Sequence, residues 1–92
     1  MKYLTFSWDE KKDQANLKKH GVSFDEAKTV FFDENAVEYP DPDHSDDEDR
    51  FLMVGRSYRF RMLIVCHCLR NEESEIRIIS ARKLTKKELS SF

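Results

Sequence analysis

Three strand-like segments joined by very short links fill the C-terminal half of the chain, and no other feature constrains the fold as strongly. The segments are RFLMVGRS, RFRMLIVCHCLR and EIRIISAR, and each has the apolar alternation or apolar run of a β-strand. The links RSYR and RNEES are too short for the crossover that parallel strands require. The three segments are therefore predicted to form an antiparallel meander.

The N-terminal third is predicted to supply one short strand and two helices. The segment YLTFSW alternates as a strand does. Asp9 suits the N-cap of a helix that ends near His20, and Gly21 suits the left-handed residue that follows a helix. Ser23 and Glu26 match a capping box for a second helix, FDEAKTVFF.

Two further elements complete the predicted order. AVEY is a candidate strand that ends at Pro40 and Pro42, and LTKKELSSF is a short helix capped by Thr85, with Glu88 completing a capping box. The order is β-α-α-β-β-β-β-α. A chain of 92 residues makes one domain, so residues 1–92 are predicted to form a single α+β domain with helices covering the sheet.

Charge is segregated along the chain. The formal net charge is −2, but residues 25–50 sum to −9 and residues 51–92 to +5. The basic half suggests a surface for a polyanion, and the acidic segment 41–49 suggests contact with a basic surface of a partner. A solvated shell of mixed charges explains the composition equally well.

Cysteine usage and hydropathy indicate the compartment. Cys66 and Cys68 would point to the same face of one strand, which is a poor geometry for a disulfide. The N-terminus lacks the apolar stretch of a signal peptide, and no window is long enough to span a membrane. We therefore expect a soluble cytoplasmic protein that does not associate with membranes.

The sequence predicts no metal or cofactor. Alternating oxygen ligands in the acidic loop resemble a calcium loop; they are Asp41, Asp43, Ser45 and Asp47. The glycine and the bidentate glutamate that such a loop needs are replaced by Asp46 and Leu52. His20, His44 and His67 share no metal-ligand spacing.

Seven arginines on or beside the C-terminal strands carry the main functional signal. They are Arg50, Arg56, Arg59, Arg61, Arg70, Arg77 and Arg82. In the last strand, strict alternation places Ile76, Ile78, Ser80 and Arg82 on one face, and Arg77, Ile79 and Ala81 on the other. Arg82 would then emerge at the end of a central strand, where a guanidinium group can bind phosphate. An ion pair with one of the many acids is the alternative.

Two histidines suit different roles. His20 lies in the sequence Lys19–His20–Gly21, and cations followed by glycine also suit the end of a helix. As a titratable group beside an ammonium, His20 could instead exchange protons in catalysis. His67 lies in the most apolar strand, which favours a buried and hydrogen-bonded side chain.

Three stretches together resemble the BrnT family of bacterial toxins, from Phe6 to about Glu88. They are FSWDEKKDQANLKKHGVSFDEAKTVFFD, HSDDEDRFLMVG and IRIISARKLTKKE. The resemblance implies a fold similar to the RelE-type ribonuclease toxins, with a twisted antiparallel sheet and packed helices. It also implies an RNA-cleaving toxin of a type II toxin–antitoxin pair that inhibits translation and growth. The implied partner is a BrnA-like ribbon-helix-helix antitoxin, and operator DNA would be bound only through their complex, which represses its own operon.

The positions that match the family motif form two groups. They are Trp8, Asp9, Asn16, Lys19, His20, Gly21, Phe24, Arg50, Gly55, Ser80, Arg82 and Glu88. Trp8, Gly21, Phe24 and Gly55 are best explained as fold-forming residues. The remaining polar positions are candidates for the functional site.

The resemblance and the chemistry of RNA cleavage together give a site prediction. Cleavage without a metal needs a group that moves protons and positive charge at the phosphate. We expect His20, assisted by Lys19, to move protons, and Arg50 and Arg82 to hold the scissile phosphate. Weaker candidates for RNA contacts are Arg61, His67, Arg77, Ser80 and Lys83. A non-catalytic nucleic-acid-binding domain and a protein-interaction domain are the alternatives.

Overall fold

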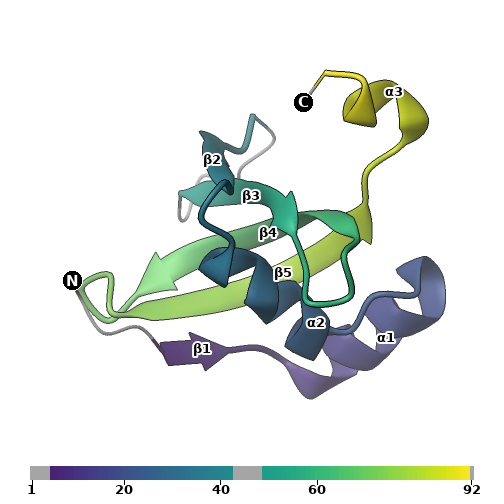
Figure 1. Cartoon of the computed structure of the whole chain (residues 1–92). Coiled ribbons are helices and arrows are strands. Elements are labelled where there is room, and N and C mark those ends of the chain that lie inside the picture. Colours follow the sequence, from purple (N-terminus) through teal and green to yellow (C-terminus); the bar gives the residue numbers. More distant parts are fainter. Residues whose placement is uncertain (1–4, 43–48, 92) are drawn as a thin grey trace.

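The predicted element order is present in the structure, a computed structural model that describes residues 5–42 and 49–91 (Figure 1). The elements are β1 (Thr5–Ser7), α1 (Glu10–His20), α2 (Phe24–Thr29), the 3-10 helix η1 (Val30–Phe32), β2 (Val37–Pro40), β3 (Arg50–Arg56), β4 (Met62–Arg70), β5 (Glu75–Lys83) and α3 (Lys86–Leu89). The α+β class is confirmed. The strand predicted to start at Arg59 starts at Met62, because Ser57 and Arg61 close a turn whose Phe60 has a positive φ of 62°.

The five strands form one sheet in the order β1-β5-β4-β3-β2. β3, β4 and β5 make the predicted antiparallel meander, and β2 pairs antiparallel with β3. β1 pairs in parallel with β5, so the sheet is mixed rather than wholly antiparallel. The long connection from β1 to β5 through the helices and the meander permits this parallel pairing, which a hairpin link would not.

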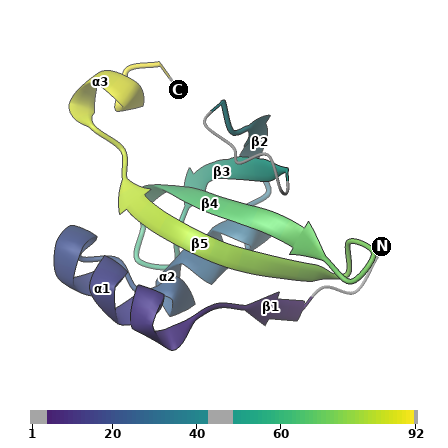
Figure 2. The ribbon, with the colours of Figure 1, turned by 180° about the vertical axis from the view of Figure 1, so that it is seen from behind.

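The core lies between the sheet and the two N-terminal helices, which cover one face of the sheet (Figures 1 and 2). The helical side contributes Val22, Phe24, Ala27 and Val30, and the strands contribute Leu63, Val65, Ile76, Ile78 and Ala81. α3 lies beyond the end of β5, away from this core (Figures 1 and 2). The two N-terminal helices therefore do not cover the opposite face of the sheet.

A β-bulge in β5 changes the faces that strict alternation predicted. Cys66 pairs with Ser80 and His67 with Ile78, so Ile79 is an extra residue in β5. The alternation is shifted after the bulge, and Ala81 is buried in the core together with Ile78. The prediction that Ser80 and Arg82 share a face with Ile76 and Ile78 is therefore wrong.

Candidate functional site

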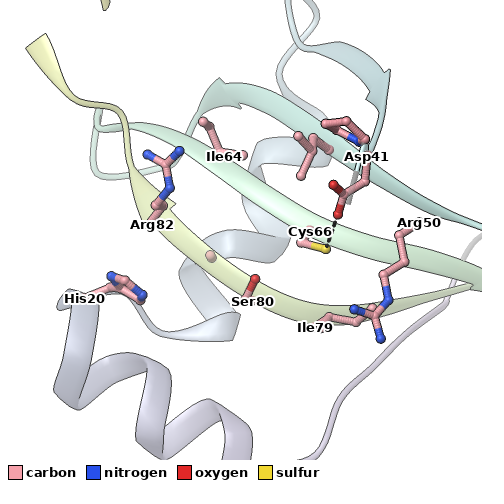
Figure 3. Close-up of a pocket in the computed structure, with 11 residues that line it drawn as sticks. His20, Asp41, Arg50, Ile64, Cys66, Ile79, Ser80 and Arg82 are labelled. Atoms are coloured by element: carbon pink, nitrogen blue, oxygen red, sulfur yellow. Dashed lines mark hydrogen bonds between the residues drawn. The ribbon is translucent and has the colours of Figure 1, made fainter. Parts of the chain in front are cut away.

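A pocket of about 400 Å³ lies on the sheet face opposite the helices (Figure 3). Its lining residues come from the end of α1, the β2–β3 link and the three meander strands. They are His20, Asp41, Pro42, Arg50, Leu52, Ile64, Cys66, Ile79, Ser80, Ala81 and Arg82. Figure 3 shows His20 and Arg82 on one side of the pocket and Arg50 on the other. Four of the predicted site residues therefore meet in one place: His20, Arg50, Ser80 and Arg82.

His20 reaches the pocket because α1 ends beside it. Asp9 caps the helix, its Oδ1 accepting hydrogen bonds from the backbone N–H groups of Lys11 (2.8 Å) and Lys12 (3.2 Å). Gly21 ends it in a left-handed conformation (φ 70°). His20, the last residue of α1, is half-buried, whereas Lys19 is exposed and does not line the pocket.

Asn16 fixes the end of α1 to β5. Its side-chain nitrogen donates to the carbonyl oxygens of Val22 (2.9 Å) and Ala81 (2.8 Å), and its oxygen accepts from the N–H of Ala81 (3.1 Å). β1 pairs only with the first part of β5 and does not reach Ala81. The Asn16 side chain therefore takes the place of a neighbouring strand at Ala81. Asn16 is buried, and it ties the end of α1, which carries His20, to the strand that carries Arg82.

Arg82 is held by a carboxylate of α3. Its Nη1 and Nη2 atoms donate to the two oxygens of Glu88 at 2.8 and 2.9 Å, and Nη1 also donates to the carbonyl of Lys83 at 3.1 Å. Glu88 also accepts from the N–H of Thr85, which completes the predicted capping box. Hydrogen bonds from Arg82 and Thr85 lower the pKa of Glu88 to about 2. The ion pair that was the alternative for Arg82 is therefore present, and it orients the guanidinium group.

Arg50 contains an unsatisfied donor. Its Nε atom is the one buried side-chain nitrogen or oxygen without a hydrogen-bond partner in the described part of the chain. A buried donor without an acceptor costs about 1–3 kcal/mol. An oxygen of a bound ligand, such as a phosphate oxygen, would remove that cost. In the sheet, Arg50 of β3 lies opposite Cys68 of β4, and Cys68 lies opposite Arg77 of β5. This register places Arg77 on the same face of the sheet as Arg50.

Three polar groups meet on the floor of the pocket. The Cys66 thiol donates to Oδ2 of Asp41 at 3.5 Å, and Ser80 is its partner across the strands. Burial, and then the hydrogen bond to Asp41, raise the pKa of Cys66 to about 11, although Arg50 and Ser80 act in the opposite direction. Cys66 therefore stays a thiol near neutral pH and is not an activated nucleophile.

Arg61 is not in the pocket, because its guanidinium group binds the buried carboxylate of Glu26. Arg61 Nε donates to Glu26 Oε2 at 2.9 Å, Nη2 contacts Oε1, and Nη2 also donates to the carbonyl of Gly21 at 3.0 Å. Hydrogen bonds from Arg61 hold the pKa of Glu26 below its ordinary value, against the effect of burial. The capping box predicted for Ser23 and Glu26 is only half formed, since this carboxylate is turned toward Arg61 and Ser57.

His67 is fully buried on the helix-covered face. Its ring nitrogens lie 3.1 Å from Glu38 Oε2 and 3.2 Å from the carbonyl oxygen of Val65, and the rings of Phe31 and Phe51 pack beside it. The interpretation as a buried, hydrogen-bonded histidine is confirmed. This placement excludes a direct RNA contact by His67.

Lys83 lies outside the pocket. It is exposed and lines a separate groove together with Arg61. In contrast, Asp41 lines the pocket, although the sequence suggested it only as a calcium ligand or as part of an acidic surface for a partner. No local pattern could have placed Asp41 beside Cys66, because their contact depends on the register of three strands. The other residues of that calcium hypothesis, Asp43 to Asp47, lie outside the described residues.

Two absences can be stated for residues 5–42 and 49–91. No three or more His, Cys, Asp or Glu side chains gather there as a metal site would require. None of the helices in the described ranges is long and apolar enough to cross a bilayer.

Comparisons with known proteins show a family and a similar fold. Residues 8–88 match a family model described as the ribonuclease toxin BrnT of a type II toxin–antitoxin system. The fold is similar to that in the 1.1 Å crystal structure of the Brucella abortus ribonuclease toxin BrnT, with a TM-score of 0.69 and 22% sequence identity. That match covers 90% of this chain and 99% of the other. Among curated proteins, no sequence gives a significant match.

Proposed function

This chain belongs to the BrnT family of ribonuclease toxins of type II toxin–antitoxin systems, and from that premise we propose that its pocket is the RNA-cleaving site. The observation that carries the proposal is the meeting of His20, Arg50 and Arg82 in one pocket from positions far apart in the sequence. Metal-independent phosphodiester cleavage requires proton transfer and positive charge at the phosphate, which a histidine and two guanidinium groups can supply.

The proposed reaction uses the ribose as its own nucleophile. His20 takes the proton of a 2′-hydroxyl group, and the 2′-oxygen attacks the adjacent phosphorus. The bond from phosphorus to the 5′-oxygen breaks, and that oxygen takes up a proton from the protonated imidazole of His20 or from water. The products are a 2′,3′-cyclic phosphate and a 5′-hydroxyl group, and no metal or cofactor takes part.

The two arginines stabilise the negative charge that develops on the phosphate oxygens. Support for Arg50 comes from its buried Nε donor, which a phosphate oxygen would satisfy. Support for Arg82 comes from its ion pair with Glu88, which fixes the orientation of the guanidinium group. The N–H groups of Arg82 that do not bind Glu88 can then donate to a second phosphate oxygen. Lys19, exposed one residue before His20, contributes positive charge from the rim. Arg77 and Ser80 contact the RNA on the same face.

A type II toxin has an antitoxin partner, and we propose that this partner is a BrnA-like ribbon-helix-helix protein that covers the pocket. Blocking a cationic pocket would neutralise the toxin in the cytoplasm, where both molecules would meet RNA. Operator DNA would be bound by the antitoxin within the joint complex, which would repress its own operon.

The proposal is tested with purified protein and a single-stranded RNA in buffer that contains EDTA. The expected products carry 2′,3′-cyclic phosphate and 5′-hydroxyl ends, and His20→Gln is expected to slow their formation at least 100-fold. RNA that is retained but never cut would indicate a binding domain instead. Antitoxin binding without any effect on RNA or growth would indicate a protein-interaction domain.

A further inference from the structure

The RNA pocket contains a carboxylate that phosphate binding does not explain. Asp41 lines the pocket together with His20, Arg50 and Arg82, and Figure 3 shows its carboxylate directed toward Cys66. A carboxylate repels a phosphate group and accepts hydrogen bonds without donating any. Its place in this pocket therefore calls for a ligand group that presents N–H donors.

The position of Asp41 is fixed at two points. Its backbone N–H donates to the carbonyl oxygen of Arg50 at 2.9 Å, which continues the pairing of β2 with β3. Its Oδ2 atom accepts the Cys66 thiol proton at 3.5 Å. A carboxylate has about four acceptor positions. A ligand can therefore add N–H groups to the partners that Asp41 already has.

The rest of the pocket suits a flat, apolar-faced group. Leu52, Ile64 and Ile79 contribute side chains from three adjacent strands, beside the sulfur of Cys66. The volume of about 400 Å³ falls within the range of small-ligand pockets, about 300–1,000 Å³. Bases in single-stranded RNA are recognised in this way, with apolar contacts on the ring and hydrogen bonds on the Watson–Crick edge.

We propose that this pocket holds one nucleobase next to the scissile phosphate and that Asp41 makes it selective for guanine. Guanine presents two adjacent donors, N1–H and the 2-amino group, which match the two oxygens of a carboxylate. Adenine and cytosine present an amino donor beside a ring-nitrogen acceptor, and uracil presents one N–H between two carbonyl acceptors. An acceptor facing a carboxylate is left unpaired, and sites built on hydrogen bonds reject such ligands strongly. This inference rests on the proposed ribonuclease function.

The selectivity is measured with oligodeoxynucleotides that contain a single ribonucleotide, since only that residue has the 2′-hydroxyl group needed for cleavage. Guanine, adenine, cytosine, uracil or hypoxanthine is placed either on the ribonucleotide or on its 3′ neighbour. We expect guanine at one of these positions to raise the wild-type rate on the order of 10- to 100-fold over uracil. With hypoxanthine, which lacks the 2-amino group, the cleavage rate is expected to lie between the rates with guanine and with uracil.

The variant Asp41→Asn is expected to lose most of the preference for guanine, because an amide presents one acceptor and one donor. Asp25→Asn is the matched control, since Asp25 is exposed on α2 and outside the pocket. It is expected to keep the wild-type preference. Binding of all-deoxy oligonucleotides, which cannot be cut, is measured in parallel and is expected to show the same preference.

The outcomes separate this inference from the proposed function. Equal wild-type rates for all bases, or a guanine preference that survives in Asp41→Asn, would overturn the role of Asp41 and leave the ribonuclease function standing. A wild-type protein that cuts no RNA but binds guanine-containing strands preferentially would overturn the ribonuclease function alone. Unchanged base selectivity with weakened antitoxin binding in Asp41→Asn would show that Asp41 receives a basic side chain of the partner instead.

Discussion

Arg82 and Glu88 form a two-point ion pair that joins the end of β5 to α3, with donor–acceptor distances of 2.8 and 2.9 Å. Such a pair holds the guanidinium group in one plane, whereas a single contact would let it rotate. α3 has four residues and no buried side chain, so this ion pair is a main attachment of α3 to the sheet. The position of the Arg82 guanidinium group in the pocket thus depends on a carboxylate that itself lies outside the pocket.

Replacing Arg82 tests the centre of the proposed site. Arg82→Ala is expected to slow RNA cleavage about 100-fold or more, as does loss of other donors that stabilise transition-state charge. Arg82→Lys is expected to recover only part of the rate, because an ammonium group lacks the planar fork. Cleavage rates of folded protein check both variants, and Arg56→Ala serves as an exposed control outside the pocket. An Arg82→Ala protein that folds and cuts RNA at the parental rate would remove Arg82 from the site.

The Arg82–Glu88 pair also predicts a dependence of stability on pH. The pKa of Glu88 in the folded chain, about 2, lies below its ordinary value of 4.5. The unfolded chain therefore takes up the proton first as the pH falls. The stabilisation is complete above pH 4.5 and disappears as the pH falls toward about 2. Urea unfolding of the wild type and Glu88→Gln should differ at pH 6 and converge near pH 2. A constant difference across that range would contradict the assignment.

Asn16 is expected to act through the fold rather than through ligand binding. Asn16→Ala would leave the buried N–H and carbonyl groups of Ala81 without their partner, at a cost of about 3 kcal/mol of unfolding free energy. Urea denaturation measures this loss, and Gln14→Ala on the exposed side of α1 is the control. Because Asn16 fixes His20 near Arg82, the rate of cleavage per folded molecule should also fall. A variant of parental stability would show that water replaces the amide.

Loss of the Arg61–Glu26 ion pair is expected to lower the stability of the fold without lowering the rate of RNA cleavage. Arg61→Met would leave the nearly buried carboxylate of Glu26 with only Ser57 and the more distant Arg59, and we expect a loss of about 3 kcal/mol in unfolding free energy. Cleavage by the fraction that remains folded should match the wild type, since Arg61 does not line the pocket. Titration with RNA under conditions in which the variant stays folded would reveal any lost RNA contact as a higher KM.

Local sequence signals predicted the parts of the fold that depend on near neighbours. The caps at Asp9 and Thr85 and the left-handed Gly21 follow from hydrogen bonds within a few residues. Short links likewise determined the direction of the meander strands. The parallel pairing of β1 with β5 could not be predicted, because it joins residues about 70 positions apart and no local pattern encodes it.

The candidate site was predicted in its residue types but not in its geometry. His20, Arg50 and Arg82 were found because they match positions of the BrnT family motif and carry groups that RNA cleavage needs. Arg61 was the weaker candidate of two arginines in the sequence, and its guanidinium group binds a buried carboxylate, whereas that of Arg82 lines the pocket. Asp41 was missed because its place beside Cys66 depends on how β2, β3 and β4 pair, which the apolar alternation within each strand does not specify.

The bulge at Ile79 keeps the end of β5 in phase with β4. Ile78 still pairs with His67 and Ser80 with Cys66, so the extra residue stays outside the ladder and the faces of the residues that follow do not exchange. If Ile79 were paired as an ordinary strand residue, strict alternation would direct Arg82 toward the helices. In evolutionary terms, the bulge lets this strand carry an inserted residue while its arginine keeps facing the pocket. A single-codon deletion of Ile79 would therefore leave a regular strand with the same two faces.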